Sequence, residues 1–459
     1  MNEKKRFNGE GTSAGSPTLK RSLSLKYVVF FGLAFMAPTT MFSTYGIAVQ
    51  GTNGMIPTAY IVALMVMLFT AYSYTQMVKA FPNAGAAYTF TQKSLSPHIG
   101  FLVGWTILLD YVFSPMISAL LLGIAMKAYF PSIPMFIWIV LFIITITIVN
   151  ILGITVAAKF NMTLLFVQFG TLTLFVIFSV KGLLNGLGAG TLFSMLPFVD
   201  ANVNTTGFMS VIPLLCFSFL GFDAVTTLSE ETKNPVKSIP RAIFLVTLIG
   251  GVYYVVGSYF LQLVWPDYQS FHDPEAAYIE IAMYVGGNFL TSYILAEGIM
   301  ASFSSAVASG TSASRILYAM GRERVLPAKI FGYLSPKFRT PVFNILMIGG
   351  IALSALFLSL TTAVSLINFG ALFAFTFVNL SVIAHFFFRK KQRSVTGTVR
   401  YLILPLIGAS LTGLFWVKLD IHSLILGGAW LTLGFLYLLN LTKMFRQLPP
   451  ELTFEEGQT

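Results

Sequence analysis

The chain carries little charge for its length. Of its 459 residues, 10% are charged and 56% are apolar, whereas a soluble domain carries roughly 25% charged residues. A folded soluble protein needs more polar surface than this sequence supplies. The composition therefore argues against a soluble enzyme, a nucleic-acid-binding protein and a disordered scaffold, and it indicates that most of the chain faces lipid.

Cysteine and histidine are scarce as well. The single cysteine, Cys216, excludes a disulfide framework and a cysteine-rich metal site. Four histidines leave little material for a zinc centre. No nucleotide-binding or metalloprotease motif occurs in the sequence. We therefore expect no enzymatic activity, no bound metal and no cofactor.

Long apolar stretches recur along the whole chain. Each can cross about 30 Å of hydrocarbon as a helix, and each is too long and too uniformly apolar for a strand of a membrane barrel. The sequence thus predicts an all-α polytopic membrane protein with twelve transmembrane helices. The expected spans are 27–50, 56–78, 99–129, 133–153, 161–181, 209–229, 241–265, 288–312, 341–360, 364–388, 400–418 and 422–442.

The positions of the basic residues predict the orientation of these spans. With both termini in the cytoplasm, all of the 28 Lys and Arg residues except Lys127, Lys181 and Lys418 fall on the cytoplasmic side. Such an excess marks the inner face of a plasma membrane protein. The net charge of +11 therefore indicates the orientation of the chain in the membrane and contact of its basic clusters with the lipid bilayer. It does not indicate nucleic-acid binding.

We expect three regions along the chain. Residues 1–24 are polar and rich in Gly and Ser, which is typical of a disordered cytoplasmic tail. Residues 25–445 hold all twelve expected spans and form the transmembrane transporter domain, and 446–459 form a second cytoplasmic tail.

The first and sixth expected spans share an interruption. Pro38 and Gly46 are separated by the same interval as Pro213 and Gly221, and each stretch carries a Phe-Ser pair at the same offset. Proline removes a helix hydrogen bond and glycine tolerates unusual dihedral angles. Ordinary kinks are the alternative explanation. The shared spacing favours two broken helices in corresponding positions.

Broken helices that lie five spans apart predict an internal repeat. Because five is odd, the second repeat enters the membrane in the opposite direction, as in transporters built from inverted repeats. The first repeat would cover about 27–181 and the second about 209–388, followed by two extra helices at about 400–442. Unwound backbone is tolerated in a bilayer only where it is buried or lines a cavity. We therefore expect a substrate site between spans one and six.

Three carboxylates fall within the expected spans: Asp110, Asp223 and Glu297. None has a Lys or Arg at helical spacing in its own span. A carboxyl group at such depth is costly. It is either protonated and bonded to a neighbouring helix, or it holds a cation, or it relays protons. Three acids without a base predict a site for a cation, a coupling proton, or both.

Several aromatic residues adjoin these acids and breaks. Ring faces attract ammonium groups, so Tyr45, Tyr111, Phe217 and Phe219 are candidate substrate-binding residues together with Ser43 in the first break. Tyr111 and the pair Phe217 and Phe219 stand out because each adjoins an acid or a break.

At several positions the sequence resembles the amino acid–polyamine–organocation superfamily. The stretches that carry the resemblance are 80–88, 230–235, 239–241 and 321–327. Others resemble bacterial putrescine importers within it: 92–97, 104–111, 216–223, 367–370 and 375–380. The resemblance implies two inverted five-helix repeats and uptake of a polyamine or amino acid, usually coupled to protons. It implies a site between spans one, three, six and eight.

The sequence departs from the putrescine pattern at two positions. Those importers carry an acid in the first break, where this chain has Ser43, and a neutral eighth span, where this chain has Glu297. One interpretation is that Glu297 supplies the missing charge from another helix. In the other, the substrate is a monoamine or an amino acid whose carboxylate binds the amides and hydroxyls near Ser43.

Two functions follow as hypotheses. The first is a proton-coupled importer of putrescine or a related amine, in which Asp110 with Glu297 or Asp223 holds the ammonium groups and a second acid carries the proton. The alternative is an amino acid permease of the same fold. Sodium coupling through hydroxyls such as Ser304 and Ser305 is an open alternative, although close helix packing by these small residues is the preferred interpretation.

Overall fold

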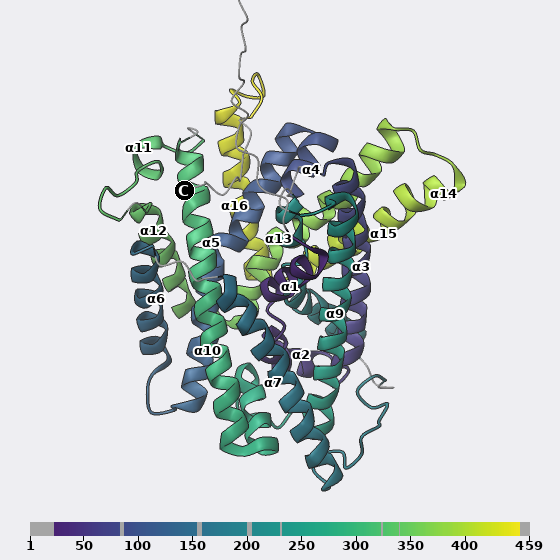
Figure 1. Cartoon of the computed structure of the whole chain (residues 1–459), viewed down its shortest axis with the longest axis vertical. Coiled ribbons are helices and arrows are strands. Elements are labelled where there is room, and N and C mark those ends of the chain that lie inside the picture. Colours follow the sequence, from purple (N-terminus) through teal and green to yellow (C-terminus); the bar gives the residue numbers. More distant parts are fainter. Residues whose placement is uncertain are drawn as a thin grey trace, which may run out of the picture.

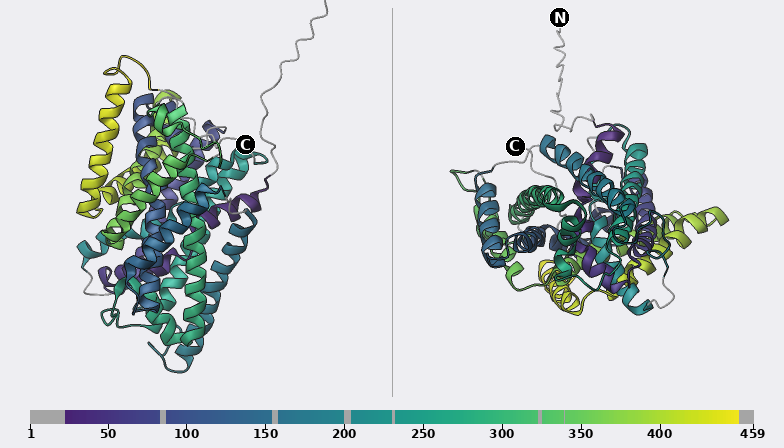
Figure 2. Two further views of the ribbon diagram at one scale, coloured as in Figure 1. Left: turned by 90° about the vertical axis from the view of Figure 1, so that its left-hand side faces the viewer. Right: turned by 90° about the horizontal axis from the view of Figure 1, so that it is seen from below.

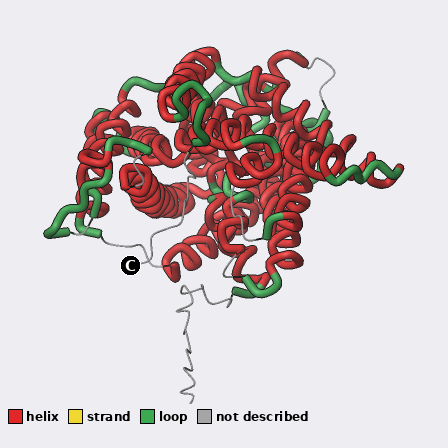
Figure 3. The backbone as a smooth tube through the Cα atoms, turned by 90° about the horizontal axis from the view of Figure 1, so that it is seen from above, coloured by secondary structure: helices red, strands yellow, loops and turns green. Residues whose placement is uncertain are grey.

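The computed structural model of the chain is helical throughout the part that it describes. Figure 3 shows helices joined by loops, and the only strand-like feature in that part is an isolated bridge between Leu23 and Thr232. The described residues are 23–82, 87–153, 158–199, 204–229, 232–322, 325–338 and 340–449.

The α-helices follow one another in a simple order. Short 3-10 or π-helical segments, labelled η, interrupt or extend several of them. The α-helices are α1 Leu25–Met36, α2 Thr40–Gly51, α3 Ile56–Ala80, α4 Ala87–Ser94, α5 Pro97–Tyr129, α6 Met135–Ile151, α7 Ala158–Leu184, α8 Thr205–Cys216, α9 Pro235–Val264, α10 Ala277–Arg322, α11 Ala328–Phe331, α12 Val342–Ala352, α13 Leu360–Val382, α14 Val395–Thr398, α15 Leu404–Val417 and α16 Ile421–Leu441. The η segments are η1 Phe217–Phe219, η2 Ala224–Ser229, η3 Pro274–Ala276, η4 Leu353–Leu356, η5 Ile383–Arg389 and η6 Val399–Ile403.

Many of these helices are long and apolar enough to cross a membrane. Within the described part, nine single helical stretches meet this condition, and α1 with α2 makes a tenth if the bent pair is one span. Two shorter apolar helices, Met135–Ile151 and Val342–Leu356, lie between them. The prediction of an all-helical polytopic membrane protein is confirmed. The number twelve and the inverted repeat stay predictions.

Local sequence signals explain where the central helices begin. Ser96 accepts a hydrogen bond from the backbone N–H of Ile99 at 3.2 Å, and Pro97 follows as the first helical residue of α5. Serine at the N-cap and proline just inside it are favourable at a helix start. Ser359 caps α13 in the same way, by accepting from Thr362 N–H at 3.3 Å. These caps fix the start of two helices that border the site.

The helices pack side by side into a bundle with α13 near its middle (Figure 1). In the central stretch that contains α13, 78% of the residues are buried, compared with 17% in α16. Figure 2 shows α16, in yellow, along the outer side of the bundle. The most extensive helix pairs are α3 with α9 and α5 with α10. Residues on α5 and α10 therefore lie close to one another in this structure.

Some sequence-based expectations fall outside the described residues. The expected tails 1–24 and 446–459 do so almost entirely. Three of the stretches that carry the superfamily resemblance, 80–88, 230–235 and 321–327, do so in part.

Candidate functional site

The first expected span is broken where the sequence predicted an interruption. Helices α1 and α2 meet at an angle of 50° across residues 37–39. Ala37 adopts a left-handed conformation with φ of 46°, and Pro38 follows it. Because proline lacks an N–H and left-handed backbone does not continue an α-helix, the chain leaves α1 here and restarts as α2.

The sixth span is broken as well, but at a different point in the motif. Helix α8 ends at Cys216, and the chain continues through η1, a turn and η2. Gly221 lies in this turn with φ of 110°. A Cβ there would lie 2.6 Å from Phe35 Cδ1 and 3.0 Å from Met36 N, so only glycine allows the turn to approach the end of α1.

The proline–glycine spacing therefore identified the two broken spans, but the breaks do not fall at the same position of the motif. Pro38 lies in the first break, whereas Pro213 lies inside α8. Gly221 lies in the second break, whereas Gly46 is a buried residue within α2. What the two spans share is the length of the first half, since α1 and α8 each contain 12 residues before the break.

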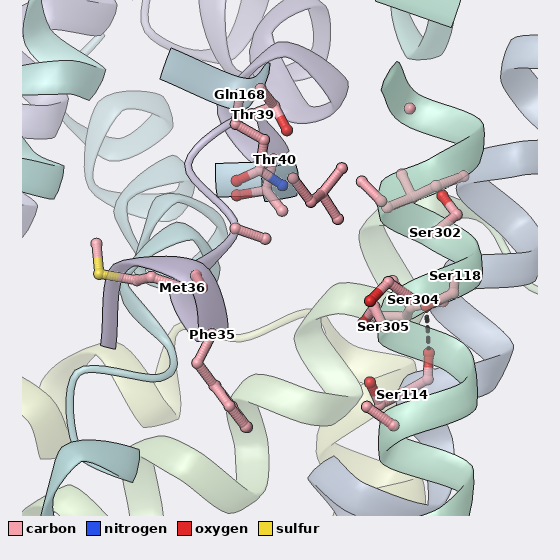
Figure 4. Close-up of a pocket in the computed structure, with 18 of the residues that line it drawn as sticks. Phe35, Met36, Thr39, Thr40, Ser114, Ser118, Gln168, Ser302, Ser304 and Ser305 are labelled. Atoms are coloured by element: carbon pink, nitrogen blue, oxygen red, sulfur yellow. Dashed lines mark hydrogen bonds between the residues drawn. The ribbon is translucent and has the colours of Figure 1, made fainter. Parts of the chain in front are cut away.

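A cavity of about 320 Å³ lies beside the first break. Its lining comes mainly from α1, α2, α5, α7 and α10, with Phe217 and Leu220 of the second break and Ile367 of α13. Figure 4 shows Thr39 and Thr40 facing serines of α10 across this space. Among the described residues, the lining contains two carboxylates and no Lys, Arg or His. This arrangement favours a positively charged ligand.

Asp110 and Tyr111 line the cavity from α5. Asp110 has no hydrogen-bond partner among the described residues, and its carboxyl group is close enough to Asp223 for the two to interact electrostatically. Asp223 accepts a bond from the backbone N–H of Gly221 at 3.3 Å. Asp110 and Asp223, from two different spans, are therefore within electrostatic range of each other, although Asp223 is not part of the cavity lining.

The hydroxyl of Tyr74 belongs to the same neighbourhood. Tyr74 is 1% exposed, its hydroxyl has no hydrogen-bond partner among the described residues, and it interacts electrostatically with Asp223 and Tyr111. The ring is held edge-on by Phe222 at 5.7 Å and Phe375 at 6.0 Å. A buried hydroxyl without a partner is unusual in a native protein, and this one interacts electrostatically with the carboxyl group of Asp223.

Glu297 lies at the other side of the first break. Its side chain is only 3% exposed, and its Oε1 accepts a hydrogen bond from the Thr39 hydroxyl at 3.0 Å. Thr39 is the N-cap residue of α2. The carboxylate of α10 thus lies against the positive end of a half-helix, where a negative charge is stabilised.

The remaining predicted residues divide into two groups. Ser43 and Phe217 line the cavity. Tyr45 and Phe219 do not. The Tyr45 hydroxyl donates to Gln262 Oε1 at 2.9 Å, and Phe219 packs edge-on against Tyr254 at 5.1 Å. Both are fully buried, so the structure gives them a packing position outside the cavity.

Two groups of lining residues were missed or misjudged from the sequence. Gln168 of α7 is 2% exposed and reaches the cavity, and its Oε1 has no hydrogen-bond partner among the described residues. Packing was the preferred interpretation for Ser304 and Ser305, and both line the cavity; three further serines of α10, which were not singled out from the sequence, line it as well: Ser302, Ser309 and Ser312. Their recurrence at helical spacing was the available signal, because it predicts one polar face.

These features define a polytopic helical membrane protein whose interior cavity is lined by two carboxylates, and comparison with known proteins gives its family. Residues 27–440 match the amino acid permease family, so the chain belongs to it. It is a permease and not an enzyme.

Among its relatives, the low-affinity putrescine importer PlaP of Escherichia coli (strain K12) is 44% identical over 434 residues, which cover 94% of this chain and 96% of the relative. The methylthioribose transporter of Bacillus subtilis (strain 168) is 26% identical, over 85% of this chain and 86% of its own length. The branched-chain amino acid permease BcaP of the same organism is 25% identical, over 86% of each.

Proposed function

We propose that the protein imports putrescine or a related amine across the plasma membrane as a proton-coupled secondary transporter. The observation that carries this proposal is the charge of the cavity. Asp110 and Glu297 line it, Asp223 is close enough to interact electrostatically with Asp110, and the described lining contains no basic residue. A site with negative groups and no cation of its own favours a ligand that brings ammonium groups. The similarity to a putrescine importer supports the same substrate class.

The proposed transport cycle is alternating access around this site. Two inverted five-helix repeats, about 27–181 and 209–388, would rock relative to each other, with the extra helices at about 400–442 outside the moving core. Both termini would lie in the cytoplasm, as the distribution of basic residues predicts. Two broken spans, with first halves of equal length, support such a repeat.

In this proposal some of the acids bind the substrate and another carries the proton. Asp110 and Asp223 would hold an ammonium group of the substrate from one side, with the Tyr111 ring beside them. Glu297 would face the substrate from α10. One of these three carboxyl groups would release its proton on the cytoplasmic side. Sodium in place of the proton would need the hydroxyls of Ser304 and Ser305, which do line the cavity.

An amino acid permease is the second candidate. The family match and the relative BcaP favour it. The half-helix α2 begins beside the cavity, and a helix N-terminus favours an anionic group. An amino acid would place its carboxylate there and its ammonium group near the acids.

Uptake into proteoliposomes tests the proposal. The purified full-length protein is given labelled putrescine with an imposed proton gradient, with a sodium gradient, or with neither. Unlabelled amines and amino acids are added as competitors. We expect acceleration by the proton gradient and competition by short diamines. Competition by amino acids but not by diamines would contradict amine import, and acceleration by sodium alone would contradict proton coupling.

A further inference from the structure

The carboxylate of Glu297 occupies a place that suits a substrate's carboxylate. The N-terminus of a half-helix carries partial positive charge, and in transporters with broken helices it faces an anionic group of the substrate. The first turn of α2 contains no acidic residue, and the side chain of its N-cap residue Thr39 makes no bond to its own helix. The Thr39 hydroxyl donates to Glu297 instead. The protein itself therefore supplies an anion at this end of α2.

An unpartnered acceptor lines the same cavity as this carboxylate. Gln168 lines the cavity, and its Oε1 is buried without a hydrogen-bond partner among the described residues. In the view of Figure 4, Gln168 lies on the same side of the cavity as Thr39 and Thr40 of the break. A buried oxygen of this kind calls for a donor from a ligand or a water molecule. A primary ammonium group has three N–H donors, which suits both the carboxylate of Glu297 and the oxygen of Gln168.

We infer that Glu297 substitutes for the carboxylate that an amino acid would bring, and so selects amines that lack one. With Glu297 in place, the start of α2 no longer attracts an anion. It presents a carboxylate and an amide oxygen to a cation. An amino acid would bring a second carboxylate to the same position, where like charges repel. The inference rests on the proposed amine transport and names the residue that sets its specificity.

Two substitutions distinguish the effect of the charge of Glu297 from the effect of its side-chain volume. Glu297→Ala removes the carboxylate and leaves room beside Thr39 for a ligand's carboxylate. Glu297→Gln removes the charge, but its amide still fills the position. Glu280→Gln is the matched control, because Glu280 lies in α10 before the kink at Gly287, bonds His272 and is not part of the cavity lining.

Binding of two ligands to the purified full-length protein, measured by calorimetry, gives the test. The ligands are putrescine and ornithine, which has the same carbon chain with a carboxylate on one end carbon. We expect the unmodified protein and Glu280→Gln to prefer putrescine by at least about 100-fold, since Glu297 would repel the added carboxylate of ornithine. Glu297→Ala should reduce this preference at least about tenfold by gaining ornithine affinity. Glu297→Gln should weaken putrescine without that gain.

Each other outcome has a definite meaning. If Glu297→Ala keeps the preference of the unmodified protein, or loses both ligands without gaining ornithine, Glu297 does not substitute for a substrate carboxylate. In that case, uptake of putrescine by the unmodified protein into proteoliposomes still supports the proposed function. If the unmodified protein neither binds nor transports an amine, the proposed function itself is wrong.

Discussion

The side chains of Thr39 and Glu297 meet at 3.0 Å although 258 positions separate them in the chain. Thr39 lies where the first span is broken, and Glu297 lies within the long helix α10. This bond ties the break to a helix of the second expected repeat. It brings a carboxylate to the start of α2, next to a cavity that contains no basic side chain among the described residues.

Removal of the Thr39 hydroxyl should weaken amine transport. Thr39→Val keeps the shape of the side chain but leaves Glu297 without its hydrogen bond, and a bond to a charged group contributes about 1.5–3 kcal/mol. We expect the KM for putrescine to rise at least about tenfold in uptake assays. Thr39→Ser keeps a hydroxyl and should remain close to the unmodified protein. Equal KM values for all three proteins would contradict a functional role of this bond.

Asp110 should be needed for transport and not for folding. It lines the cavity and has no hydrogen-bond partner among the described residues, so Asp110→Asn breaks no bond that holds the fold. We expect uptake of putrescine to fall roughly 100-fold, because an ammonium group loses its charged partner. The melting temperature of the purified protein should stay the same.

Asp267→Asn is the control for this prediction. Asp267 lies in the loop after α9, where its carboxylate accepts only from the backbone of Gln269. This variant should transport normally. A marked fall in the melting temperature of Asp110→Asn, with uptake lost in proportion, would instead assign Asp110 a structural role.

The sequence predicted the kinds of groups in the site better than their partners. Composition and the length of the apolar stretches were sufficient to predict the polytopic helical fold, because only helices or closed barrels can cross a lipid bilayer. The three acids stood out because so little charge is present in the spans. Which of the acids lie close to one another could not be predicted. Whether Asp110 meets Asp223 or Glu297 depends on how α5, α10 and the second break pack in three dimensions.

Two further examples show the same limit. Tyr45 and Phe219 adjoin the breaks in sequence, but their side chains point into the packed interior, against Gln262 and Tyr254. Adjacency along the chain does not fix the direction of a side chain. Gln168 enters the site from α7, a span with no acid or interruption to mark it. Only the tertiary structure brings it into the same cavity as Thr39.

Gly221 should be essential for the second break. Its φ of 110° disfavours any residue with a side chain, at a cost of about 1–3 kcal/mol, and a Cβ would also collide with Phe35 and Met36. We expect Gly221→Ala to lower the melting temperature and abolish uptake, because the turn can no longer lie against the end of α1.

A second glycine serves as the comparison. Gly350 lies in α12 without a positive φ, and a Cβ at this position would have no other atom within 4 Å. Gly350→Ala should leave uptake unchanged and raise stability slightly, since alanine favours a helix over glycine by about 0.5–1 kcal/mol. Similar melting temperatures for the two variants would show that Gly221 is not required by its conformation.

The serine face of α10 should lie along the path of the substrate. Ser305 is exposed to the cavity, whereas the neighbouring Ala306 is fully buried. The single cysteine, Cys216, is buried, so the unmodified protein should not react with a water-soluble thiol reagent. Ser305→Cys should react, and Ala306→Cys should not. Putrescine at ten times its Kd should slow the reaction of Ser305→Cys about tenfold, because bound ligand occludes the cavity. Labelling at the same rate with and without putrescine would place the substrate away from this face of α10.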